Sequence, residues 1–153
     1  MKKTIISAIL LFCILMGGCS NAFAKEQYDD TDLIIGSADR YAKSMAVMNT
    51  VDNTITFTAQ QFDGRETLWS ALYEDYRNVD VEFTFRISSG KAKLVFIDSE
   101  GNLENIAEIT PDSVIDVTMQ YTALMREGNN RIKIVGYDCE NVELYMELKE
   151  WFE

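Results

Sequence analysis

Residues 79–87 read VDVEFTFRI and alternate without interruption between apolar side chains and charged or hydroxyl-bearing ones. Successive side chains of a β-strand point to opposite faces of its sheet, so this pattern predicts a strand with one buried and one solvent-facing side. The same period of two recurs along most of the chain. It predicts further strands over residues 54–60, 91–98, 115–121, 131–137 and 142–148.

Short clusters of residues that tolerate a positive φ separate these segments, and we expect each cluster to be a turn. They are residues 62–65, 88–91, 98–102 and 127–130. Eight or nine short strands joined by such turns favour an all-β fold, specifically an antiparallel β-sandwich of the jelly-roll kind. Residues 37–49 allow two interpretations, a short helix or a first strand within 44–51. We favour a strand from about Ala46, preceded by a loose or helical segment.

The first 24 residues carry the features of an export signal. Lys2 and Lys3 give a positive start, and residues 4–16 are apolar apart from Thr4 and Ser7. A run of this length is too short to cross a bilayer, which needs about 20 residues. It is typical of a signal peptide.

Gly17, Gly18 and Cys19 follow the apolar run and resemble a bacterial lipobox. We therefore expect residues 1–18 to be a lipoprotein signal peptide and Cys19 to carry the lipid that anchors the protein to the membrane. Residues 22–24 (AFA) offer a second cleavage site, which gives a secretory signal over 1–24 and a soluble secreted protein. An uncut signal anchor is the third interpretation. All three place the folded part outside the cytoplasm.

The remaining chain divides into two parts. Residues 25–32 are polar and acidic, so we expect residues 19–32 to be an acidic flexible tether. Residues 33–153 then form a single β-sandwich domain, a length that suits one hydrophobic core.

The charge of the chain excludes one class of partner. The sequence has 14 basic and 25 acidic side chains, and loss of residues 1–18 removes two lysines, which leaves a formal charge of −13. Nucleic acid binding depends on phosphate neutralisation by Lys and Arg, so we expect no nucleic acid partner. Neutral sugars and proteins remain open as partners.

The residue types that carry most hydrolytic chemistry are missing. The chain has no histidine, and Cys139 is the one cysteine outside the signal region. Carboxylates surround Cys139, which disfavours its thiolate, so we interpret it as a packing residue. No pair of acids stands out as a catalytic pair, and we expect no enzyme activity and no cofactor. Residues 98–102 carry oxygen ligands that would suit a structural calcium, but they also make an ordinary hairpin turn.

Three stretches give the chain a resemblance to known proteins: residues 54–69, 89–98 and 128–136. In strand and turn pattern, residues 54–148 are similar to small lipoproteins of Gram-positive bacteria and, more loosely, to jelly-roll carbohydrate-binding modules. The resemblance implies a β-sandwich with a binding role, and it assigns no functional residue.

Aromatic side chains are the natural platform for a sugar ring. In the stretch Glu66–Glu74, Trp69 and Tyr73 share one face, opposite Leu68 and Leu72. If the leucine face is the core, Trp69 and Tyr73 point outward. We take Trp69, Tyr73, Tyr76 and Trp151 as candidate ligand-binding residues. The sequence thus favours an exported, lipid-anchored, non-catalytic module that binds a neutral glycan or wall component. The alternative is an accessory lipoprotein that binds a protein in an envelope complex.

Overall fold

The computed structural model describes residue 25, residues 27–113 and residues 117–150. Within these residues, eight strands form one sheet in which every pairing is antiparallel. The all-β prediction is therefore confirmed. The elements are α2 (Thr31–Ile35), β1 (Arg40–Ser44), β2 (Val47–Val51), β3 (Thr54–Tyr73), β4 (Arg77–Arg86), β5 (Ser89–Ile97), β6 (Leu103–Ile109), β7 (Met119–Met125) and β8 (Gly128–Glu150).

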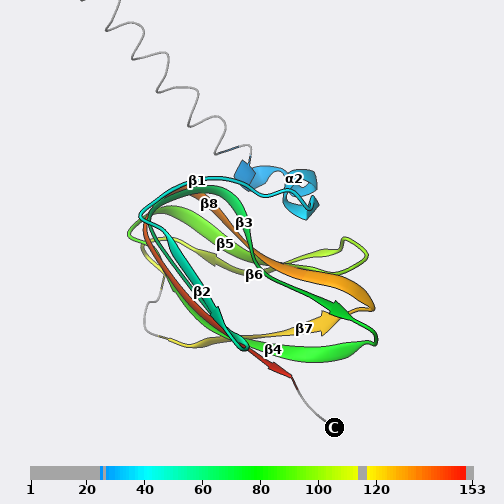
Figure 1. Cartoon of the computed structure of the whole chain (residues 1–153). Coiled ribbons are helices and arrows are strands. Elements are labelled where there is room, and N and C mark those ends of the chain that lie inside the picture. The colour runs from blue at the N-terminus through cyan, green and yellow to red at the C-terminus, as the bar shows by residue number, and fades with distance from the viewer. Residues whose placement is uncertain (1–24, 26, 114–116, 151–153) are drawn as a thin grey trace, which may run out of the picture.

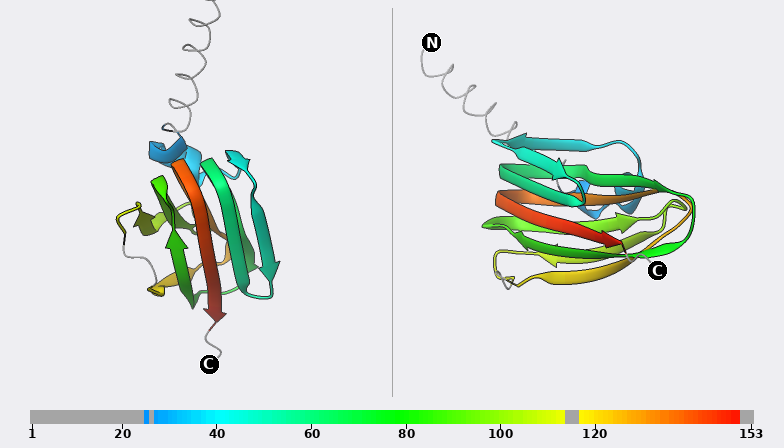
Figure 2. Two further views of the ribbon diagram at one scale, coloured as in Figure 1. Left: turned by 90° about the vertical axis from the view of Figure 1, so that its left-hand side faces the viewer. Right: turned by 60° about the horizontal axis from the view of Figure 1, so that its bottom comes forward.

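The sheet becomes a sandwich because its long strands bend at the same place (Figure 1). β3 and β8 pair from Thr54 to Tyr73, with a register shift where Phe62 and Gly64 lie opposite Cys139 and Gly136. β4 pairs with the C-terminal half of β8, and β5 pairs with its N-terminal half. The single sheet therefore doubles over into two layers that face each other. Figure 2 (left) looks onto the layer that contains β4, the end of β8, the start of β3, and β2.

Two glycines in this bend correct our turn predictions. We expected chain reversals at 62–65 and 88–91, but Gly64 lies inside β3 and Gly90 inside β5. Their φ angles are 107° and 79°. A Cβ atom on either one would lie 2.2 Å from a backbone carbonyl oxygen, that of Arg40 or that of Asp138. Gly64 bends the continuous strand β3, and Gly90 lies at the start of β5. At both positions two backbones come into close contact, a known role of glycine within strands.

The core lies between the two layers and contains the residues that the alternation predicted. The inward side chains of 79–87 and of 142–148 are all buried, as are Ile55, Phe57 and Ala59 from β3. They pack against Ala92, Leu94 and Phe96 of the other layer. Phe57 and Phe62 meet edge to face with their ring centroids 5.4 Å apart.

A second, smaller cluster attaches the N-terminal segment to the outer face of β5 and β8. Tyr28 and Ile34 pack there against Val95, Ile97 and Val135. The Tyr28 hydroxyl donates to Glu108 Oε1 at 2.7 Å. The expectation of a flexible tether as far as Asp32 is therefore wrong from Gln27 onward, because Gln27 and Tyr28 are buried.

Two basic side chains of β8 hold the next part of this segment. Lys133 is fully buried, and its ammonium donates to the carbonyl oxygen of Gly36 at 2.7 Å and lies 3.3 Å from an Asp39 carboxylate oxygen. Burial lowers the pKa of Lys133, and the charge of Asp39 opposes this effect. Arg131 donates to the carbonyl oxygens of Ile35 and Gly36. Polar groups on β8 thus fix a segment that the sequence alone suggested was loose.

Two strand boundaries also differ from our predictions. The favoured strand from about Ala46 is confirmed by β2, but the segment before it is the strand β1, neither loose nor helical. β7 begins at Met119, and Val117 is exposed. The first two residues of the predicted strand 115–121, residues 115 and 116, lie outside the described residues.

The bend gives a first testable prediction. Gly64→Ala should destabilise the protein much more than Gly101→Ala, since both glycines have a positive φ but only Gly64 lacks space for a Cβ atom. We expect a loss of about 1–2 kcal/mol for Gly101→Ala, from φ strain alone. The loss at Gly64 should be several times larger. Urea unfolding followed by circular dichroism measures both, and equal losses would contradict the close packing at the bend.

Candidate binding surfaces

Three of the four predicted aromatic residues lie at the end of the sandwich opposite the bend. Trp69 and Tyr73 are neighbours near the end of β3, with ring centroids 6.3 Å apart. The Tyr73 hydroxyl donates to Glu150 Oε1 at 2.7 Å, and the Arg77 guanidinium lies 5.3 Å from the Tyr73 ring centroid. Burial and the bond to Glu150 raise the pKa of Tyr73. Tyr76 lies in the connection between β3 and β4. Trp151 falls outside the described residues.

The predicted orientation of Trp69 and Tyr73 is wrong. Tyr73 belongs to the core and Trp69 is half-buried against it, whereas Leu72 is 78% exposed. The cause is a register shift between Thr67 and Trp69, which exchanges the two faces of the strand beyond it. Leu68, which lies at the shift itself, is buried as expected. These two rings therefore do not form an exposed platform.

Of the three predicted aromatics within the described residues, Tyr76 remains accessible, with 59% of its surface exposed. The guanidinium of Arg126 lies 5.7 Å from its ring centroid. Arg126 is itself held by Asp98, at 2.7 Å. A single phenol ring beside an arginine offers a small stacking surface.

The loop at 98–102 is the hairpin turn between β5 and β6. Asp98 Oδ1 accepts hydrogen bonds from the amides of Glu100 and Asn102, and Oδ2 accepts from the Asn102 side chain. Burial alone would raise the pKa of Asp98, but these hydrogen bonds and the charge of Arg126 lower it. The carboxylate oxygens are thus engaged within the protein. In the part of the chain that the structure describes, no group of three or more His, Cys, Asp and Glu side chains could hold a metal ion.

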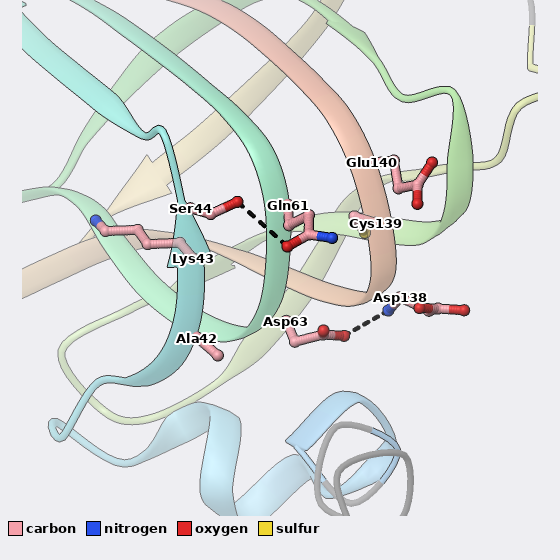
Figure 3. Close-up of a pocket in the computed structure, with 8 residues that line it drawn as sticks. All are labelled: Ala42, Lys43, Ser44, Gln61, Asp63, Asp138, Cys139 and Glu140. Atoms are coloured by element: carbon pink, nitrogen blue, oxygen red, sulfur yellow. Dashed lines mark hydrogen bonds between the residues drawn. The ribbon is translucent and has the colours of Figure 1, made fainter. Parts of the chain in front are cut away.

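A shallow pocket of about 230 Å³ lies at the bend (Figure 3). Its lining comes from β1, β3 and β8: Ala42, Lys43, Ser44, Gln61, Asp63, Asp138, Cys139 and Glu140. Figure 3 shows the Asp63 carboxylate accepting from the Asp138 amide, at 2.5 Å, and Ser44 donating to Gln61. The buried Cys139 thiol donates to the carbonyl oxygen of Lys91 at 3.1 Å. Burial raises its pKa to about 12, which disfavours the thiolate, the nucleophilic form of the side chain.

Among the described residues, several exposed apolar side chains gather at the free edge of the sheet. We define the β2 edge strip as residues 44–51, that is β2 with Ser44, Met45 and Ala46 before it. All five residues of β2 are exposed, and among the strands of the described ranges β2 pairs with β3 alone. Met45, Val47, Met48 and Val51 expose 82%, 55%, 42% and 67% of their surface. Figure 2 (left) shows β2 at the margin of its layer.

Sequence reasoning missed this surface, although the sequence contains a signal for it. Residues 44–51 read SMAVMNTV and carry no charge, in a chain of which 25% is charged. An uncharged run of this length ordinarily predicts a buried strand. Here the strand is at the edge, and that placement depends on long-range pairing.

Within residues 25, 27–113 and 117–150, no helix has the length and apolar character that crossing a bilayer requires. The predicted signal peptide and Cys19 lie outside these residues.

Comparison with solved structures finds carbohydrate-binding modules of similar architecture. A family 29 module complexed with mannohexaose is 11% identical with a TM-score of 0.41, and the match covers 74% of this chain and 81% of that one. The module CBM6cm-2 from Cellvibrio mixtus lichenase 5A, in complex with cellotriose, is 12% identical with a TM-score of 0.39, over 72% of this chain and 91% of that one. No protein-family model and no curated protein matches the sequence.

The environment of Cys139 gives a second prediction. At pH 8 the native thiol should react with a disulfide reagent roughly a thousandfold more slowly than the unfolded chain, because the fraction of thiolate falls tenfold for each unit by which the pKa rises. The form from Lys25 to Glu153 contains this cysteine alone, so absorbance reports it directly. Fast reaction of the folded protein would contradict the burial of the thiol.

Proposed function

We propose that this chain is an exported, lipid-anchored, non-catalytic module of the cell envelope that binds a protein partner through the β2 edge strip. The observation that carries the proposal is the exposure of β2 along its whole length, without a charge or a proline among its five residues. Natural sheets usually protect an edge strand with charged side chains, proline or a covering segment, because its unpaired backbone groups invite another strand. A strand that lacks these features is suited to pair with a partner.

The local backbone limits the size of this contact. Met45 has a φ of 45° and separates β1 from β2, so the edge that β2 offers is five residues long. Such a contact is smaller than a standard protein interface, and we expect moderate affinity. A membrane anchor compensates for moderate affinity, since it raises the local concentration of the protein.

The features of residues 1–24 support export and anchoring. Cleavage before Cys19 leaves Gln27, the first buried residue among those that the structure describes, eight positions after the lipidated residue. Eight residues span at most about 28 Å even when fully extended. The folded part is therefore held within that distance of the membrane surface. Cleavage after Ala24 gives the same domain in a secreted form.

The side-chain chemistry supports a binding role over a catalytic one. The chain lacks histidine, and the thiol of Cys139 is buried, which raises its pKa. The pocket at the bend contains the carboxylates of Asp63, Asp138 and Glu140, and Asp63 is engaged with the Asp138 amide. The lining of this pocket is mostly polar and charged, unlike the uncharged β2 edge strip.

The test places a photo-crosslinking residue at Met48 in the cells that produce the protein. We expect a discrete covalent adduct, because Met48 lies on the exposed strand β2. The same residue at Leu72 is the matched control, since Leu72 is an exposed apolar residue outside the strip. Absence of an adduct at Met48, or the same adduct at both positions, would refute the proposal.

A second candidate function is binding of a neutral glycan at Tyr76. The specific observation in its favour is the exposed phenol ring, which can stack on the apolar face of a pyranose. The modules named above were solved with mannohexaose and cellotriose, which makes these two sugars suitable probes.

Titration calorimetry with mannohexaose and cellotriose tests this second function. We expect weak saturable binding that disappears in Tyr76→Ala and persists in Tyr145→Ala, which removes an exposed tyrosine from β8. A lack of heat with either sugar, or an equal loss in both variants, would exclude Tyr76 as a glycan site.

A further inference from the structure

We propose that the β2 edge strip binds the same strip of a second copy of this chain, in an antiparallel pair centred on Asn49. This inference rests on the proposed function and names its partner. β2 reads VMNTV, so its two valines are equally distant from Asn49. A two-fold axis through Asn49 places Val47 opposite Val51 of the other copy, and Asn49 opposite its counterpart.

The register within one copy shows which side chains meet on the outer face of this pair. Val47, Asn49 and Val51 lie opposite Thr58, Thr56 and Thr54 of β3. These threonines alternate with the buried Ile55 and Phe57, so they point away from the core. Directly opposed residues of an antiparallel pair share a face, and β-branched pairs stabilise it. The four valines of the two copies would therefore pack on one face, on both sides of the asparagine pair.

Charge favours a second copy over a basic partner. The chain carries a net charge of −11, so two copies repel each other across most of their surface. In the pair centred on Asn49, Asp52 lies opposite Ala46, and no acid faces an acid along residues 44–52. Lys43, just before the strip, is paired with Glu66 at 2.5 Å. A basic partner would need acidic side chains to recognise, and the strip has none.

The uncharged strip and the acidic chain together predict an unusual salt dependence. Salt screens the repulsion between two acidic copies and leaves apolar contact intact, so association of the copies should strengthen as ionic strength rises. Binding of a basic partner would weaken under the same change. The sign of the salt effect therefore distinguishes the two kinds of partner.

A charge exchange at the two-fold axis tests the proposal. The protein is the form from Lys25 to Glu153, which contains both hydrophobic clusters complete, and sedimentation equilibrium measures its mass over a range of concentrations and salt. We expect a reversible dimer that strengthens with salt. Asn49→Lys and Asn49→Asp place like charges opposite each other, and each should weaken the dimer by up to about fivefold. An equimolar mixture of the two variants should restore it.

Controls separate this result from loss of folding and from failure of the proposed function. Asn49 is exposed, so both variants should keep the wild-type circular dichroism spectrum, and Leu72→Lys should leave the dimer unchanged. A monomer at all concentrations and salt levels would overturn the inference. Dimers whose stability is the same in the wild type, Asn49→Lys and Asn49→Asp would also overturn it. If Met48 then crosslinks to a different protein, the proposed function stands without the second copy. If Met48 gives no adduct either, both fail.

Discussion

The fold depends on one constraint. Three neighbouring strand paths of a single sheet must all bend along the same line. β3 bends at Gly64, β8 near Asp138, and the path from β4 to β5 at Gly90. The backbones approach so closely there that the glycines have no space for a Cβ atom. Because the bend is shared, the hydrogen-bonded ladder between β3 and β8 continues through it and carries both layers. The core then forms from residues that lie on one face of one sheet.

This origin of the sandwich also decides which surfaces are covered. The outer face of β5 and β8 receives the N-terminal segment, where Tyr28 packs on the sheet and the buried Lys133 holds Gly36 and Asp39. The edge of β3 in the other layer receives only the five residues of β2. β2 adds a strand to the sheet but no covering for itself. The chain thus leaves the outer face of β5 and β8 and continues as β2 at the edge of β3. The exposed strip is a direct consequence of this path.

The alternating pattern predicted the strands and the inward residues well, because each depends on local periodicity and burial. It failed where a local signal has two structural meanings. A glycine with a positive φ ends a strand in a turn, but at Gly64 it bends a continuous one. The register shift after Thr67 reversed the faces of Trp69 and Tyr73. The local sequence pattern does not predict such a shift. Tyr28 gave no signal either, since its partner Glu108 is 80 residues away in sequence.

Net charge and the uncharged strip are best understood together. An unprotected edge strand ordinarily carries a risk of open-ended aggregation. Repulsion between acidic copies opposes contact wherever their charges face each other. Residues 44–51 are a part of this edge that carries no charged side chain. The break at Met45 restricts that part to one short strand, which a single two-fold contact occupies completely. The same acidity that opposes contact between copies therefore confines any pairing of copies to one place and one orientation.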